Sequence, residues 1–458
     1  MPVLTTTHPQ GAAQGRSQMV IPKPEKIDID FTDAKLTGMA GSLFVARLAN
    51  QLKLPDLLKE QIRLKKRDRG CDDKDSLLGL IHNFCAGNGK LSDMDALRAD
   101  KPAVNLLGLE DVRSSKRMGE YLALFNANAV KSLYAIAHSL CQQIAPDVIQ
   151  HFVEQKGYLS VFLDGTEIEV TGRHFEQAYV GYSGNKQYWL HNIFIGHLWV
   201  SGRLNPGASD VCIGWKEQLE NDVSPLIEQG IPVWARMDNA YYRKEVVEWF
   251  EQKQWDFSVS VTNSNNCRPV LDFIDGLPDS AWTPIRSDKT EEAIFSHHQP
   301  AGWQQEQTYV VTRSWHDGRQ WLMEPRYGVI LVSRSDLPLK ELVKRHREKQ
   351  GQENAQKGPL TDLDLHHPPC RKFHANQAFY ACGQIAQILL RALQYRGLPK
   401  KERKHGIRPL IRKLVRSVGQ LTCSGRKWTL KFVKTTAALD WLWEASNRLD
   451  DRRSSVST

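Results

Sequence analysis

The chain has 458 residues, of which 41% are hydrophobic, and carries a formal net charge of +9. This length suits roughly three folding units with buried cores. No stretch approaches the apolar length of a membrane span, and the eight cysteines never form a CxxC pair, so neither a membrane protein nor a zinc ribbon or disulfide framework is expected. The cysteine pattern fits a reducing cytosol. The positive charge favours a polyanionic partner, because clustered Lys and Arg release counterions from phosphate backbones.

The first part of the chain is predicted to be helical. Residues 1–33 are polar and contain proline, and we expect a disordered arm and not a signal peptide. From there to about residue 150, apolar residues recur every three or four positions, which predicts a separate α-helical domain over 34–150. Ser114 or Ser115 can cap a helix. Its start carries a cluster of cations, which indicates either a DNA-binding helix or a solvated helix start: Arg113, Lys116 and Arg117.

Residues 151–264 read as strands alternating with helices. LSVFLD is a strand, 187–204 is a hairpin that splits at Gly196 or Gly202, and IPVWARMD is a buried strand after a helical connection. A helix YYRKEVVEWFEQK and the alternating strand DFSVSVT follow. This order predicts an α/β fold in which helices cover a mixed sheet.

Three further segments complete the chain. Residues 265–337 are predicted to be a β-rich insertion, 338–398 to return to helices, and 399–458 to form a basic C-terminal region with a hairpin that turns at Ser424-Gly425. Three tryptophans of the insertion either pack in its core or stack on a DNA base, a contact worth ~1–3 kcal/mol. They are Trp303, Trp315 and Trp321.

The stretch VFLDGTEIEV raises a question about Asp164, because Asp-Gly between strand-forming residues is also a strong hairpin signal. A second apolar strand, PVWARMD, also ends in an aspartate, Asp238. If a right-handed crossover makes the two strands neighbours, both aspartates emerge at one edge of the sheet, where open α/β sheets place their sites. A third acid would complete a site for Mg²⁺, which prefers oxygen ligands.

The motifs resemble a known family. LDGTEIEV together with RMDNAYYRKEVVEWFEQKQWDFSVSV, then GQENAQK and HHPPCRKFHANQAFY, resemble bacterial insertion-sequence transposases with an RNase H-like catalytic domain. The nearest similarity is to the IS-four-like superfamily, in particular its IS-thirteen-eighty branch. LRADKPAVNLLGLEDVRSSKRMGEYLALF is similar to the N-terminal region of that group.

The resemblance implies a DDE triad of Asp164, Asp238 and Glu353, with spacings of 74 and 115 residues. These carboxylates would hold Mg²⁺, for which Mn²⁺ can substitute. The long second spacing implies a β-rich insertion, in agreement with the strand pattern of 265–337. With Asp164 in a strand that continues past Gly165, the missing side chain of Gly165 leaves room beside metals and DNA. Alternation then puts Glu167 and Glu169 on the opposite face.

The chain departs from the superfamily pattern around Glu353. The positions of a Tyr, an Arg and a Lys in that pattern hold His346, Lys349 and Leu360. A polar ring and a cation still suit DNA phosphates, whereas Leu360 does not, so Lys357, four residues after Glu353, is the expected substitute. Glu348 is the rival for the third acid.

The resemblance implies a DNA transposase of the bacterial cytosol, associated with the nucleoid, that binds terminal inverted repeats, cleaves the ends and joins their 3′-OH to target DNA. Pairing of two ends implies at least a dimer on DNA. The alternatives are an RNase H-like nuclease without strand transfer and a catalytically dead DNA-binding regulator. The helical N-terminal domain and the C-terminal cations would bind DNA, the latter being Lys400, Lys401, Arg403, Lys404, Arg408 and Arg412.

Overall fold

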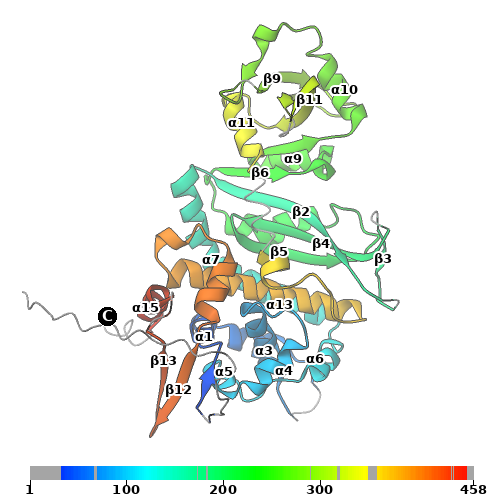
Figure 1. The fold of residues 1–458 in the computed structure, drawn as a ribbon. Helices are drawn as coiled ribbons and strands as arrows, with labels where there is room; N and C mark the ends of the chain where they lie inside the picture. Colours follow the sequence, from blue (N-terminus) through cyan, green and yellow to red (C-terminus); the bar gives the residue numbers. More distant parts are fainter. Residues whose placement is uncertain are drawn as a thin grey trace, which may run out of the picture. The chain divides into compact units, whose positions relative to one another are not determined.

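The computed structural model describes residues 32, 34–65, 70–172, 174–181, 184–288, 290–316, 320–348, 358–434, 436 and 438–450. The chain from Lys35 onward forms one compact unit (Figure 1). None of the helices in these ranges combines the length and the apolar character that crossing a membrane requires.

The predicted helical region is present and contains seven helices within its described residues. The longest, α7, is capped by Asn126, whose side chain accepts from Ala129 N, and ends at Gly157 with φ 77°. The helix bounds are α1 Ser42–Gln51, α2 Leu54–Gln61, α3 Asp73–Cys85, α4 Asp93–Ala99, α5 Lys101–Leu106, α6 Ser115–Leu122 and α7 Ala127–Lys156.

A ten-stranded mixed sheet forms the other half of the fold. Its strand order is β3-β4-β2-β6-β7-β11-β10-β9-β8, with β5 paired to β4. Only the β2–β6 and β6–β7 pairs are parallel among the described strands, and the predicted mixed α/β sheet is confirmed. The bounds are β2 Leu159–Glu169, β3 Tyr179–Val180, β4 Lys186–Ile195, β5 Leu198–Asn205, β6 Val233–Met237, β7 Asp256–Val261, β8 Thr283–Pro284, β9 Glu291–His298, β10 Gln307–His316 and β11 Trp321–Val332.

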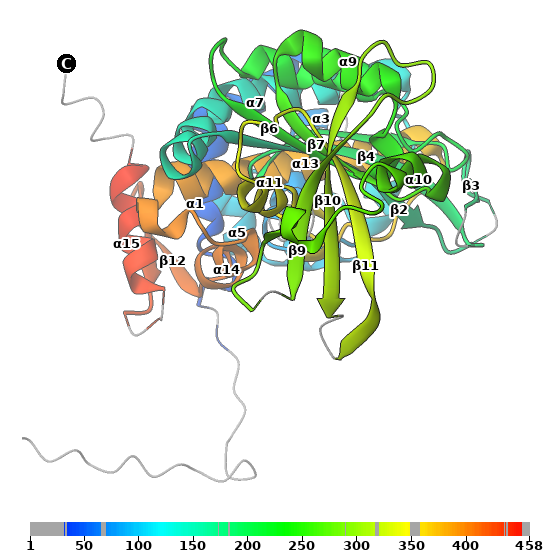
Figure 2. The same cartoon turned by 90° about the horizontal axis from the view of Figure 1, so that it is seen from above.

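The predicted β-rich insertion is part of this same sheet. Its last strand, β11, pairs antiparallel with β7 over Val329↔Val261 to Val332↔Ser258, so the strands β8 to β11 extend the sheet from β7 (Figure 2). Helix α11 (Leu339–His346) packs against β9 and β10 of this extension. The predicted boundaries at 264 and 337 therefore fall within one sheet.

The remaining elements connect or flank the sheet. The β4–β5 hairpin turns at Gly196, with φ 54°, which was one of the two predicted positions. The C-terminal hairpin pairs Ser424 with Lys427, so its turn lies at Gly425-Arg426, one residue later than predicted. The bounds are α8 Trp215–Gln218, α9 Lys244–Lys253, α10 Ser264–Asp272, α13 Phe373–Ala392, α14 Ile407–Leu410, α15 Leu439–Arg448, and a small sheet of β1 Leu36–Thr37, β12 Gly419–Ser424 and β13 Lys427–Phe432.

Helix α13 joins the helical region to the sheet. It packs against α3 and α7 on one side and β5 on the other, and nearly all of its residues are buried (Figure 1). Phe379 of α13 meets Phe84 of α3 edge to face at 4.9 Å, while Gln387 Nε2 donates to His197 O at 2.7 Å beside β5. Its buried polar side chains also have partners, as Gln384 Nε2 donates to Val200 O of β5 at 2.9 Å. The helical region, predicted as a separate domain, therefore shares one hydrophobic core with the sheet.

Candidate active site

Asp164 lies in the middle of a continuous strand and not in a turn. β2 pairs with β4 from Val161↔Ile195 to Glu169↔Gln187, with Asp164 opposite Asn192. The side chain of Asp164 is half-buried. The hairpin interpretation of VFLDGTEIEV is therefore wrong, because the Asp-Gly dipeptide sits within an unbroken antiparallel ladder.

Gly165 makes room for a protein side chain. A Cβ on Gly165 would lie 2.1 Å from Cζ2 of Trp189, and the indole is fixed by its Nε1, which donates to Val211 O at 2.9 Å. Neighbouring residues of a strand point to opposite faces, so Gly165 lies on the face opposite Asp164. The predicted space for metals and DNA above Gly165 is instead filled by this indole.

Asp238 follows the parallel neighbour of β2. The last register pair of β2 and β6 is Phe162↔Arg236, and each aspartate lies two residues beyond its member of that pair. Paired strands lie about 4.8 Å apart, and residues two apart share a face. Extending the register therefore places Asp164 and Asp238 side by side on one face of the sheet, as the sequence predicted.

The carboxylate of Asp238 is oriented by the turn that it starts. One oxygen, Oδ1, accepts from Ala240 N at 3.0 Å and caps the short 3₁₀ turn Asn239–Tyr241. Burial raises the pKa of Asp238, and the hydrogen bond from Ala240 and the charge of Arg236 only partly oppose this shift. A half-buried carboxylate with incomplete compensation favours a bound cation.

The donor chemistry of this pair fits a divalent metal, because Mg²⁺ takes a few carboxylates and keeps several waters. Within the described ranges, no group of three or more His, Cys, Asp or Glu side chains is placed to hold an ion. A third ligand would therefore come from another part of the chain. The predicted third acid, Glu353, lies outside the described residues, as do the predicted phosphate contacts Lys349 and Lys357.

The rival acid, Glu348, lies at the start of β2. Its carboxylate accepts from Lys156 Nζ at 2.7 Å and from the hydroxyl of Tyr158 at 2.9 Å, and Ser160 Oγ lies 3.5 Å away. Ser160 and Asp164 are four residues apart on the strand, which is about 13 Å. Glu348 is therefore too far from Asp164 to bind the same ion, and its charge is already paired.

His346 differs from its predicted role as a DNA contact. Its ring is buried, with Nδ1 3.0 Å from Ser258 Oγ and Nε2 3.0 Å from Ser260 Oγ. Burial, with the charges of Arg236 and Arg347, lowers the pKa of His346 to about 3. The neutral ring fixes the end of α11 to β7, so it offers no charge to a phosphate.

The cations at the start of α6 divide into two kinds. Ser114 caps the helix by accepting from Arg117 N, as predicted. Arg113 turns inward, donating to Ser76 Oγ at 2.5 Å and Cys71 O at 2.6 Å, so it fixes α3 to α6 and does not face DNA. Lys116 and Arg117 are exposed, and Arg117 pairs with exposed Glu120 at 2.8 Å.

Most of the predicted C-terminal cations face solvent. Arg403 is the exception, since it is half-buried, donates to Tyr395 O at 2.9 Å and lies over the Tyr395 ring. Two of the others, Arg408 and Arg412, are close enough to half-buried Asp362 to counter the rise that burial causes in its pKa. The exposed set is Lys400, Lys401, Lys404, Arg408 and Arg412.

The three tryptophans lie in different environments. Trp303 packs on Tyr242 with ring centroids 5.5 Å apart, and Trp315 lies near Arg313. Trp321 is 66% exposed and is the first residue of β11. Of the three stacking candidates, Trp321 alone presents most of its surface to solvent.

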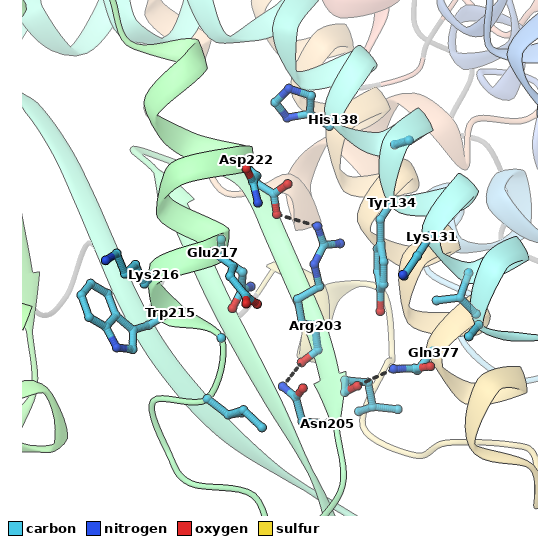
Figure 3. A pocket seen from close by; sticks show the side chains of 18 of the residues that line it. Lys131, Tyr134, His138, Arg203, Asn205, Trp215, Lys216, Glu217, Asp222 and Gln377 are labelled. Carbon is cyan, nitrogen blue, oxygen red and sulfur yellow. Dashed lines mark hydrogen bonds and ion pairs between the residues drawn. The ribbon is translucent and has the colours of Figure 1, made fainter.

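A cavity of about 1150 Å³ lies beside β5 and was missed by sequence reasoning (Figure 3). Arg203 on β5 stacks over Tyr134 of α7 at 3.8 Å and donates to Asp222 at 2.6 Å. Trp215 and Gln377 also line this cavity. These residues come from four segments and belong to no motif, so only the tertiary fold reveals the cavity.

A mixed sheet that carries two aspartates just beyond the parallel β2–β6 register is consistent with an RNase H-like catalytic fold. Comparison with protein families agrees: the model described as "Transposase DDE domain group 1" matches residues 21–454. The chain belongs to this family of DDE transposases. No curated protein matches the chain. The narrower similarity to the IS-four-like superfamily and its IS-thirteen-eighty branch stays a prediction.

Proposed function

We propose that this DDE transposase cleaves DNA at the terminal inverted repeats of an insertion sequence and joins the resulting 3′-OH ends to target DNA, with Asp164, Asp238 and Glu353 as catalytic residues. The observation that carries the proposal is the register of β2 and β6, which brings two distant aspartates together on one face of the sheet. Their separation in sequence, 74 residues, makes this pairing a property of the fold.

The assignment of Glu353 is supported by the position of the chain just before it. Glu348 contacts Ser160, about 13 Å along β2 from Asp164. Glu353 is five positions after Glu348 in the sequence, and five residues of extended chain can span up to about 17 Å. Glu353 is therefore within reach of Asp164, whereas Glu348 is held at the far end of the strand by Lys156.

The three carboxylates would hold Mg²⁺ or Mn²⁺. When bound, such metals lower the pKa of water or of a DNA 3′-OH and stabilise the leaving oxygen of a phosphoryl transfer. The protein contributes orientation, since the Ala240 N–H fixes one Asp238 oxygen and the β-ladder fixes Asp164. Lys349 and Lys357 would contact phosphates near the scissile bond.

Exposed cations supply the proposed DNA contacts away from the triad. Lys116 and Arg117 at the start of α6 are candidates for inverted-repeat binding, and the exposed C-terminal set suits DNA phosphates. Two element ends must be paired before joining, so a dimer is expected on DNA. Trp321 remains the best placed of the three tryptophans for stacking on a base.

The test is a cleavage and joining assay with labelled DNA carrying the repeats that flank the gene and a supercoiled target plasmid. We expect nicking at the repeat ends, joining of a pre-cut 3′-OH end to the plasmid, and loss of both in EDTA. Cleavage without joining would support the nuclease alternative. Binding to the repeats without either reaction would support the catalytically dead regulator, and full activity in EDTA would contradict the metal-dependent proposal.

A further inference from the structure

A chain of buried polar side chains runs from the turn after Asp238 to the cavity beside β5. The hydroxyl of Tyr241 lies 2.5 Å from His191 Nε2, and His191 Nδ1 lies 2.5 Å from Gln218 Oε1. Gln218 Nε2 donates to Ser201 Oγ at 2.8 Å, and Ser201 donates to Asp222 at 2.5 Å. All five side chains are buried.

The chemistry of the last link fixes the direction of every hydrogen bond in the chain. The Asp222 carboxylate, paired with Arg203 (Figure 3), only accepts, so Ser201 donates to it and accepts from the Gln218 amide N–H. The Gln218 carbonyl then faces His191, whose Nδ1 must carry the proton. His191 Nε2 is left as the acceptor for the Tyr241 hydroxyl. Burial lowers the pKa of His191 to about 4, consistent with this neutral tautomer.

Tyr241 is also the last residue of the turn that orients Asp238. Its backbone N donates to Asp238 O at 3.2 Å, while Asp238 Oδ1 accepts from Ala240 N. The carbonyl of Ala240 is fixed from the other side by Arg243 Nε at 2.9 Å and Cys212 Sγ at 3.3 Å. The position of the Asp238 carboxylate therefore depends on where Tyr241 is anchored.

We propose that Tyr241 is a positioning residue for Asp238, held in place by the hydrogen-bond chain through His191, Gln218, Ser201 and Asp222. A buried polar network in which each member is satisfied rigidifies its surroundings. An apolar side chain would fill the same volume without fixing the rotation of the turn. This inference rests on the proposed function, because it takes Asp238 as a catalytic carboxylate.

The molecule contains a matched control. Tyr380 is nearly as buried as Tyr241, and its hydroxyl donates to Leu365 O at 2.8 Å. Neither Tyr380, which lies on α13, nor Leu365 belongs to the turn after Asp238 or to the hydrogen-bond chain that holds it. Tyr241→Phe and Tyr380→Phe therefore remove the same atom from similarly buried sites, and of the two only Tyr241→Phe acts on the turn of Asp238.

The experiment compares these variants in thermal unfolding, DNA affinity, single-turnover cleavage and Mn²⁺ binding to the DNA-free protein by electron paramagnetic resonance. We expect Tyr241→Phe to lower the cleavage rate about tenfold and to weaken Mn²⁺ binding, with DNA affinity unchanged, since a small misplacement of a catalytic group is costly. Tyr380→Phe should leave both quantities unchanged. Ser201→Ala, which breaks the chain without touching Tyr241, should shift both in the same direction and serves if Tyr241→Phe does not fold.

Wild-type cleavage and Mn²⁺ binding in Tyr241→Phe, or equal losses in Tyr380→Phe, would overturn the inference. Asp238→Ala separates this result from the fate of the proposed function. If Asp238→Ala abolishes cleavage while Tyr241→Phe has no effect, the positioning role alone is wrong. If Asp238→Ala cleaves at the wild-type rate, the proposed function itself is wrong.

Discussion

Replacing Gly165 by alanine tests the packing beneath the active-site strand. The new Cβ would lie 2.1 Å from Cζ2 of Trp189, whereas ordinary contacts begin at 3.4 Å, so the two groups must separate by about 1.3 Å. Overpacking of this kind costs about 1–3 kcal/mol. Moving the indole also strains its hydrogen bond to Val211 O, worth about 1 kcal/mol. We expect Gly165→Ala to lower the free energy of unfolding by about 2–4 kcal/mol.

Urea unfolding followed by tryptophan fluorescence measures this change. Gly406→Ala is the control, because a Cβ there meets nothing within 4 Å, and its effect should stay within about 0.5 kcal/mol. Adding Trp189→Leu to Gly165→Ala should cost less than the sum of the single changes, since the clash is removed. A Gly165→Ala protein as stable as the wild type would refute the reasoning.

Three further predictions concern pH, DNA and metal. Burial lowers the pKa of four histidines in the folded state to about 3 or 4. As the pH drops from 7.5 to 5.5, the unfolded state therefore binds protons first, and the free energy of unfolding measured in urea should fall by up to about 1 kcal/mol per histidine. A free energy of unfolding that does not change over this pH range would contradict this. The four histidines are His82, His191, His197 and His346. Alanine at Lys404, Arg408 and Arg412 together should weaken DNA binding and reduce the salt slope in anisotropy titrations by up to about 3, unlike alanine at Lys59, an exposed cation of α2 outside the proposed DNA contacts. Mg²⁺ should raise the unfolding temperature of the wild type and not of Asp238→Ala, because the cation stabilises the half-buried carboxylate of Asp238.

The sequence correctly predicted the two neighbouring strands that carry Asp164 and Asp238, while the catalytic role of these residues stays a prediction. Asp164 and Asp238 each end or interrupt an apolar run, and a crossover between two such strands makes them neighbours. The order of strands and helices in 151–264 was also predictable, because it follows from the local periodicity of apolar residues.

The parts that the sequence did not predict depend on pairing between distant segments. Trp189 covers Gly165 because β4 runs antiparallel to β2. His346 was predicted to contact DNA, but its ring is buried against Ser258 and Ser260 of β7. Arg113 looked like a DNA contact, but the hydroxyl of Ser76 on α3 holds it inward. Each of these partners lies far away in the sequence, so a local sequence pattern does not identify it.

The strand pairing of the insertion was also not predictable from local sequence. Its composition predicted β structure correctly, but nothing local in 265–337 states that β11 pairs with β7 and so extends the catalytic sheet. The polar chain from Tyr241 to Asp222 likewise draws on β4, β5 and two connections. Single-residue propensities carry no information on such pairings.

The central claim is that Glu353, and not Glu348, completes the triad with Asp164 and Asp238. The most direct measurement is the single-turnover cleavage rate of Glu353→Gln and Glu348→Gln on the same labelled repeat DNA, with DNA affinity measured in parallel. We expect Glu353→Gln to bind DNA without cleaving it. Glu348→Gln should cleave at close to the wild-type rate, but with lower stability because Lys156 loses its partner. Cleavage by Glu353→Gln together with loss of cleavage in Glu348→Gln would contradict it.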